Sequence, residues 1–162
     1  MPEPRPEAPS LVSIQVGLPQ TCGEAGATDP MHVQWTSAFV KEPVAGRVFL
    51  SRTGLAGDGK ADREVHGGPE RAALAYAAGH YLRWRAELEM PNLPHGAFGE
   101  NFTVAGLDET TACIADTLAI GEAIVQVSTP RGPCWKIARR WQRADLLRRV
   151  AQMAARRKGA RG

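Results

Sequence analysis

Short runs of alternating apolar and polar residues, each closed by glycine or proline, dominate the first fifty residues. Residues 11–16 show the period-two pattern of a half-buried strand, in which polar Ser13 and Gln15 alternate with apolar Val12, Ile14 and Val16. Comparable patterns predict strands over residues 31–35 and 47–51. The amino-terminal third therefore predicts a β meander and not a β-α-β unit.

The remainder of the chain adds further strands and two helices. Residues 102–104 predict a short strand, and residues 116–127 predict a hairpin around Gly121-Glu122. A helix is predicted from Pro69 to about Glu89, because apolar side chains recur on one face, at Leu74, Ala78, Tyr81, Leu82 and Leu88. A second helix is predicted at the carboxyl end, with apolar positions at Ile137, Trp141, Ala144, Leu147, Ala151 and Ala154. This order favours a mostly β fold with flanking helices.

Length and composition favour one cytoplasmic domain. A chain of 162 residues that is 43% hydrophobic can bury one proper core. Its three cysteines suit neither a disulfide framework nor a CxxC metal site, and a reducing compartment fits them best. Residues 1–10 are proline-rich and lack the pattern of a signal peptide, so we expect a disordered lead-in. No apolar run approaches the roughly 20 residues that cross a bilayer, and no membrane partner is expected.

The net charge of +3 is distributed unevenly. Residues 1–135 hold 10 Lys and Arg against 16 Asp and Glu, whereas residues 136–162 hold 10 Lys and Arg against Asp145 alone. A basic helix can bind nucleic acid or an acidic protein. Nucleic acid is the less favoured partner because no aromatic or base-reading motif accompanies the charges. We expect residues 11–149 to form the domain and residues 150–162 a solvated basic tail.

The segment 128–137 carries the most reactive side chain of the sequence, Cys134. The cysteine follows Pro133 and directly precedes the carboxyl-terminal helix, with Arg131 and Lys136 nearby. Unpaired N–H groups at a helix start and adjacent cations both favour a thiolate, which can attack, carry sulfur or bind a soft metal. A buried cysteine that acts as a small hydrophobe is the equally weighted alternative.

Three further segments carry candidate ligand contacts. The glycine-rich loop 54–62 contains Asp58 and could approach an anion closely, but it matches no nucleotide-binding motif. His66 lies in the turn His66-Gly67-Gly68-Pro69, where we expect the start of the following helix to disfavour its cationic form; a purely structural turn is the alternative. Asn101 lies where a turn enters the strand 102–104, and it could contact a ligand or the turn itself.

Taken together, several short motifs resemble the MOSC domain family, in its short stand-alone bacterial branch. The resemblance runs from about Leu11 to about Leu147, and the motifs follow in the family's order. They are Gly57-Asp58-Gly59, Asp62, His66-Gly67-Gly68-Pro69, Ala75-Tyr76, Gly99-Glu100-Asn101-Phe102-Thr103 and Pro130-Arg131-Gly132-Pro133-Cys134-Trp135-Lys136. The resemblance implies a single-domain MOSC-type β-barrel that binds a molybdenum cofactor, a molybdopterin. Family descriptions also associate the domain with pyridoxal phosphate.

The resemblance further implies an activity and roles for particular residues. Related members reduce N-hydroxylated compounds such as hydroxylaminopurines and amidoximes, and an external flavin or iron–sulfur reductase supplies the electrons. Cys134 would be the molybdenum ligand, which suits a soft thiolate. Catalytic positions would be Cys134, His66 and Asp58, and cofactor contacts would be Arg131, Gly67, Gly68, Asn101 and Lys41. The alternative is a non-catalytic cofactor-binding domain, or a carrier that holds a persulfide on Cys134.

Overall fold

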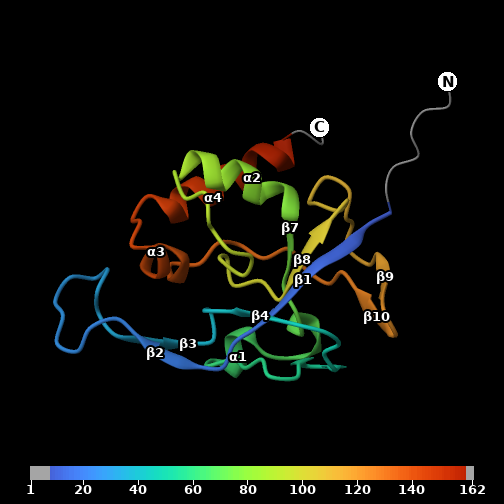
Figure 1. The fold of residues 1–162 in the computed structure, drawn as a ribbon, viewed down its shortest axis with the longest axis horizontal. Coiled ribbons are helices and arrows are strands. Elements are labelled where there is room, and N and C mark those ends of the chain that lie inside the picture. Colours follow the sequence, from blue (N-terminus) through green and yellow to red (C-terminus); the bar gives the residue numbers. More distant parts are fainter. Residues whose placement is uncertain (1–7, 160–162) are drawn as a thin grey trace.

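The computed structural model describes residues 8–159, without the side chains of Arg63 and residues 157–159, and β1 (Ser10–Val16) organises its largest sheet (Figure 1). The strand order is β4-β1-β8-β7. Both β4 (Glu42–Val44) and β8 (Phe102–Ala105) pair with β1 antiparallel, and β7 (Ala75–Ala77) pairs with β8 parallel. The predicted strands at 11–16 and 102–104 are confirmed. Residues 1–7 of the predicted lead-in lie outside the described residues.

The two faces of β1 do not follow the predicted alternation. Val12 is 48% exposed, whereas Gln15 is fully buried. The pairing with β8 shifts register between Leu11 and Ser13, and such a bulge changes which side chains face the interior. Hydrogen bonds satisfy the buried polar groups of Gln15. Its backbone N–H donates to the Asn101 carbonyl at 2.8 Å, and its side-chain oxygen accepts from the hydroxyl of Thr103 at 3.4 Å.

Three two-stranded pairs complete the β-structure. They are β2 (Gln20–Cys22) with β3 (Trp35–Ser37), β5 (Leu50–Ser51) with β6 (Gly54–Leu55), and β9 (Thr117–Ile120) with β10 (Ala123–Gln126). The third pair confirms the predicted hairpin around Gly121-Glu122. Of the strand predicted over 31–35 only Trp35 lies in β3, which continues to Ser37, and of the strand predicted over 47–51 only Leu50 and Ser51 form β5.

The four sheets do not join into a closed barrel within residues 8–159, so the predicted barrel is not confirmed. The fold is a set of mixed sheets with a few helices, which Figure 1 shows above and beside the strands. Its core gathers large side chains from β3, α2 (Ala78–Glu87), α3 (Lys136–Trp141), α4 (Leu146–Gly159) and the segments that follow β3 and α2. These are Trp35, Phe39, Tyr81, Trp84, Leu88, Leu93, Phe98, Ile137, Leu146 and Met153.

The helix predicted from Pro69 to Glu89 is wrong over its first half. Pro69–Arg71 is one turn of 3-10 helix (η1), residues 75–77 form strand β7, and helix α2 begins only at Ala78 and ends at Glu87. The pairing of Ala75, Tyr76 and Ala77 with β8 replaces the helical hydrogen bonds that local propensity favours. Helix α2 confirms the second half, and Tyr81 and Leu88 are buried as predicted, but Leu82, predicted on the same face, is 74% exposed.

The carboxyl-terminal helix is divided in two. Helix α3 (Lys136–Trp141) ends where Gln142 adopts the left-handed conformation, with φ 50°, and α4 (Leu146–Gly159) follows. The residues predicted as a solvated tail continue α4, where Val150 packs against the core and Met153 is 6% exposed. Residues 160–162 lie outside the described residues. None of the helices in the described part of the chain is long and apolar enough to span a membrane.

Candidate functional site

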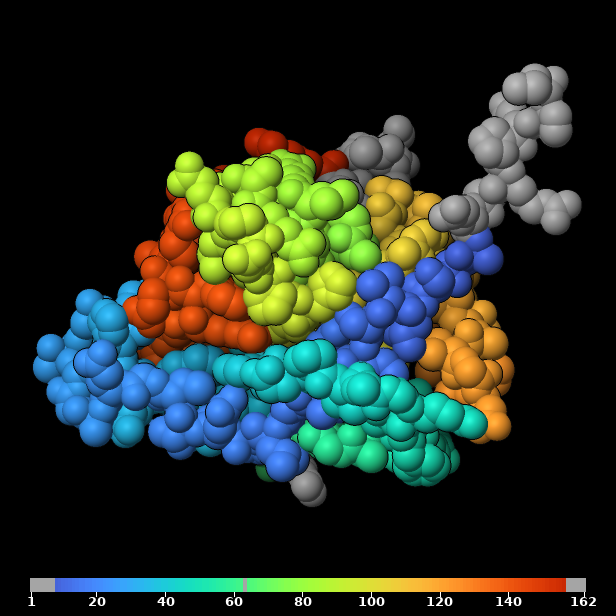
Figure 2. Space-filling model, viewed as in Figure 1, coloured from blue at the N-terminus to red at the C-terminus, as the bar shows by residue number. Residues whose placement is uncertain are grey.

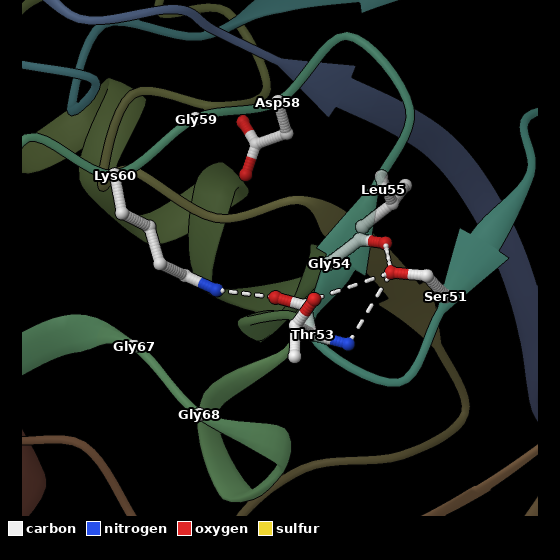
Figure 3. A pocket seen from close by; sticks show the side chains of 9 residues that line it. All are labelled: Ser51, Thr53, Gly54, Leu55, Asp58, Gly59, Lys60, Gly67 and Gly68. Atoms are coloured by element: carbon white, nitrogen blue, oxygen red, sulfur yellow. Dashed lines mark hydrogen bonds between the residues drawn. The ribbon is translucent and has the colours of Figure 1, made fainter. Parts of the chain in front are cut away.

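A cavity of about 410 Å³ lies between the β5–β6 pair, the loop after β6 and the turn after α1 (Arg63–His66) (Figure 3). Backbone, hydroxyl and charged groups surround it, which is typical of a site for a polar or anionic ligand. Of the predicted site residues it brings together Asp58, Gly67 and Gly68. The complete lining is Ser51, Thr53, Gly54, Leu55, Asp58, Gly59, Lys60, Gly67 and Gly68.

Two glycines allow the chain to pass closely around this cavity. A Cβ atom at Gly59 would lie 2.6 Å from Cδ of Pro19, so the loop can pass the β1–β2 connection only with glycine at this position. Gly68 has φ 93°, a conformation that other residues rarely adopt, and open space faces its Cα. The turn 67–68 thus exposes backbone toward the cavity, opposite Lys60 in Figure 3.

Asp58 is fixed by a buried ion pair with Lys41. The side chains are 4% and 6% exposed, and Oδ1 of Asp58 accepts from both Nζ of Lys41 and the Gly17 amide, the latter at 2.8 Å. Burial lowers the pKa of Lys41, and attraction to Asp58 opposes this shift. The pair joins the segment before β4 to the glycine-rich loop, so Lys41, which does not line the cavity itself, holds in place the Asp58 side chain that does.

Positive charge accumulates around the cavity. Desolvation and repulsion from Arg131 lower the pKa of Lys60, whose Nζ donates to the Thr53 carbonyl at 2.9 Å, and attraction to Asp58 opposes the shift. Desolvation lowers the pKa of Arg131, attraction to Cys134 opposes this, and repulsion from Arg71 adds to it. Arg131 still borders solvent, so its charge is available to an anion. These cations come from separate segments and converge on one region.

His66 does not precede a helix as predicted. It ends α1, and its amide donates to the Asp62 carbonyl at 3.0 Å. Its Nδ1 lies 3.5 Å from Nη2 of Arg131. The expected bias against the cation is confirmed, but the cause differs: burial lowers the pKa of His66 first, followed by repulsion from Arg131 and Lys136. The neutral imidazole can therefore accept a hydrogen bond from Arg131.

Cys134 lies just before α3, as predicted. Its thiol is partly buried, it is in no disulfide, and its carbonyl accepts from the Ile137 amide at 3.2 Å. The electrostatic attraction to Arg131 places it beside the cation cluster. The described residues contain no group of three or more His, Cys, Asp or Glu that could hold a metal ion. A metal at Cys134 would thus take most of its ligands from a bound cofactor.

Asn101 is not part of the cavity wall. Its Oδ1 accepts from the Leu74 amide and its Nδ2 donates to the Gln15 carbonyl, both at 3.1 Å. The side chain is 4% exposed and links β1 to the segment before β7. These contacts favour the structural alternative for Asn101, in which its side chain forms hydrogen bonds with the backbone and not with a ligand.

Comparisons with known proteins identify the family of the chain. The MOSC domain model matches residues 62–162. The uncharacterized protein YflK of Bacillus subtilis is 41% identical over 143 residues, which cover 88% of this chain and 62% of YflK. The structure resembles that of YiiM from Geobacillus stearothermophilus with a TM-score of 0.69 at 33% identity, over 91% of this chain and 64% of that one.

The chain belongs to the MOSC domain family. A protein named "Reductase" from Gibberella moniliformis is also 42% identical over 118 residues, which cover 71% of this MOSC chain and 21% of the fungal protein. The chain thus spans less than two thirds of the length of each of these relatives. The MOSC family is associated with the molybdenum cofactor.

The residues present fit such a cofactor in three respects. Cys134 offers a soft sulfur ligand and interacts electrostatically with Arg131, Lys60 lines the cavity and could attract an anionic group, and the backbone of Gly67 and Gly68 lines the same cavity. Sequence reasoning missed the cations Lys60 and Arg71. Lys60 follows the Gly57-Asp58-Gly59 motif directly and could have been found there, whereas nothing local marks Arg71.

Proposed function

We propose that this MOSC chain is a molybdenum-dependent reductase of N-hydroxylated compounds with Cys134 as the protein ligand of the metal. The observation that carries the proposal is the electrostatic interaction of Cys134 with Arg131, a cation that lies beside His66 and also acts on Lys60 in the wall of the glycine-rich cavity. The similarity to a fungal protein named as a reductase supports the reaction class. Hydroxylaminopurines and amidoximes are the substrates that we propose.

The cations of the site would hold the cofactor. Arg131 interacts electrostatically with Cys134 and its Nη2 lies 3.5 Å from Nδ1 of His66, so it can donate to an anionic oxygen near either residue. Lys60 can place its ammonium in the cavity, where the exposed backbone of Gly67 and Gly68 lies opposite. Lys41 contributes less directly, because its ammonium is engaged by Asp58. When bound, the molybdenum cofactor supplies a metal centre that accepts an oxygen atom and exchanges two electrons.

The overall reaction cleaves the N–O bond with two electrons and two protons, and it releases an amine and water. We assign His66 to passing a proton on and not to storing one, since burial and repulsion from Arg131 lower its pKa and favour the neutral imidazole. Asp58 is engaged by Lys41 and the Gly17 amide, so we assign it to orienting the loop and not to proton transfer. We propose that an external flavin or iron–sulfur reductase supplies the electrons.

The test is a comparison of two single-cysteine variants produced in a cofactor-competent host. Cys134→Ser should lose bound molybdenum and the reduction of a hydroxylaminopurine by a chemical electron donor. Cys113→Ser is the matched control, because Cys113 is an exposed free cysteine in the loop before β9. The control should retain both properties.

Two results would contradict the proposal. Wild-type protein that contains no molybdenum and is inactive would remove its basis. A purified protein in which Cys134 carries one additional sulfur by mass spectrometry, with no metal, would instead indicate sulfur transfer.

A further inference from the structure

The four tryptophans of the chain differ sharply in exposure. Trp35 and Trp84 are 8% and 1% exposed, and Trp141 packs against the core and donates from Nε1 to the Ala97 carbonyl at 2.9 Å. Trp135 is 45% exposed, and its indole N–H has no hydrogen-bond partner among the described residues. An indole ring has a large apolar face and one N–H donor, and exposed tryptophans of this kind are enriched at protein interfaces.

Two cations hold this side chain in place. The guanidinium of Arg139 lies 4.5 Å from the ring centroid of Trp135, and Nζ of Lys136 lies 5.8 Å from it. The ring of buried Trp35 packs edge-on against the ring of Trp135, with an interplanar angle of 73° and the ring centroids 5.5 Å apart. The indole is therefore fixed before any partner binds, which lowers the entropic cost of association.

The charge of this surface is unbalanced. We define the Trp135 patch as Trp135, Lys136 and Arg139. Within residues 8–159 neither cation of the patch has an ion-pair partner, although Arg139 donates to the Val33 carbonyl at 3.4 Å. The neighbouring acid Glu24 faces His32 at 3.7 Å. A cationic patch around an exposed tryptophan is complementary to an acidic protein surface.

The position of the patch connects it to the reaction. Trp135 directly follows Cys134, so their Cα atoms are about 3.8 Å apart. Figure 1 shows α3, which begins at Lys136, at one side of the molecule and the β9–β10 hairpin at the other. Figure 2 shows the hairpin as an orange lobe at the edge opposite the orange-red segment that contains α3. A protein that contacts the patch would thus lie beside Cys134.

We propose that the Trp135 patch is the docking surface for an acidic electron-donor protein. This inference rests on the proposed function, in which cleavage of each N–O bond consumes two electrons and two protons. The donor is oxidised by two electrons in total, solvent supplies the protons, and water leaves. Weak electron-transfer complexes bury less than about 1,200 Å² in total, so a small patch suffices. Tryptophan and arginine are also the residues that most often dominate binding energy in protein interfaces.

The experiment uses the full chain loaded with molybdenum cofactor and two electron donors. Reduced [2Fe–2S] ferredoxin serves as the acidic protein probe, and reduced methyl viologen serves as the small chemical donor. Trp135→Ala and Arg139→Glu should each raise the KM for ferredoxin by about tenfold, as expected for a central interface residue. Both should leave viologen-driven turnover within about twofold of the wild type. Trp135→Phe keeps an aromatic ring at this position, so its KM for ferredoxin should stay close to that of the wild type.

Charge reversal elsewhere provides the control. Arg47→Glu changes an exposed arginine that pairs with Glu122 at the tip of the hairpin, and it should leave the ferredoxin KM unchanged. Raising the ionic strength should raise this KM for the wild type and have less effect on Arg139→Glu. The unfolding transition of each variant, followed by circular dichroism, shows that the fold is retained.

Three results distinguish the outcomes. A ferredoxin KM that is the same in the wild type, Trp135→Ala and Arg139→Glu would overturn the docking surface. A parallel loss of ferredoxin- and viologen-driven turnover in Trp135→Ala would overturn it too, because the side chain would then act at the reaction centre. Absence of viologen-driven activity in the wild type would instead refute the proposed function.

Discussion

Replacing Lys41 with methionine should destabilise the protein far more than replacing an exposed partner in a comparable ion pair. Methionine preserves most of the volume of the lysine stem, so the substitution removes charge without creating a large cavity. Asp58 would remain 4% exposed and would keep one hydrogen bond, from the Gly17 amide. A buried carboxylate that loses its cation keeps its desolvation cost without the compensating attraction.

The magnitude follows from the surroundings of the pair. Removing one partner of a buried ion pair costs about 3–5 kcal/mol. Asp58 also attracts Lys60, which lies across the same cavity and stays in place. We therefore expect the lower end of the range for Lys41→Met, about 3 kcal/mol. For a chain of this length the loss corresponds to a decrease in Tm of about 6–12 °C.

The assay is equilibrium unfolding in urea at pH 7, followed by far-UV circular dichroism, with the free energy of unfolding obtained by linear extrapolation. The control is Arg47→Met. Arg47 pairs with Glu122 in the same way, but the two side chains are 82% and 85% exposed. An exposed pair contributes about 0–1 kcal/mol, so this variant should unfold almost as the wild type does.

A second variant separates loss of the pair from loss of packing. In the double variant Lys41→Met with Asp58→Asn no unpaired charge is buried, and we expect about half of the lost stability to return. The reasoning is refuted if Lys41→Met and Arg47→Met cost the same free energy of unfolding. It is equally refuted if the double variant is less stable than Lys41→Met alone.

Two further predictions concern a titration and the backbone. The midpoint of the NMR titration of His66 should lie below 6.5, because the folded state lowers its pKa. The contribution of His66 to stability is therefore complete above pH 6.5 and is lost as the pH falls through the folded-state pKa. Arg131→Gln should raise the midpoint only part of the way to 6.5, because burial is the larger cause of the shift and remains in the variant. An unchanged midpoint would exclude Arg131 as a cause. Gly79→Ala should stabilise α2 by about 0.5–1 kcal/mol, because nothing lies within 4 Å of the added Cβ. Gly99→Ala should destabilise the protein, because Gly99 has φ 81° and an added Cβ would lie 2.7 Å from the ring of Phe39. Thermal unfolding of both variants checks the opposite signs.

The parts of the fold that depend on neighbours in sequence were predictable. The hairpin around Gly121-Glu122 and the strand at 102–104 have local patterns that the structure confirms. The placement of Cys134 just before α3 was also predictable, because Pro133 precedes the cysteine and the helical periodicity begins directly after it. In the hairpin and at the start of α3 the hydrogen bonds or the turn involve residues only a few positions apart, whereas the strand at 102–104 was predictable from its pattern although its partners β1 and β7 are distant in sequence.

Errors occurred where a distant segment determines the local structure. Residues 75–77 fit a helical pattern, but pairing with β8 makes them a strand. The amide of Asn101 could be read as a ligand contact, yet the backbone of Gln15 and Leu74 engages both of its polar ends. Basic residues after Val150 suggested a solvated tail, although Met153 anchors this part of α4 in the core.

The candidate site shows the same division. The sequence by itself determined which residues are chemically suited to it, namely the thiol of Cys134, the imidazole of His66, the guanidinium of Arg131 and the glycine-rich loop. Only the tertiary structure decided that Lys41 pairs with Asp58 and that Lys60 lines the same cavity as the turn 67–68. The physical reason is that charge pairing, desolvation and cavity shape depend on distance in space, whereas sequence patterns report only on residues one or two turns apart.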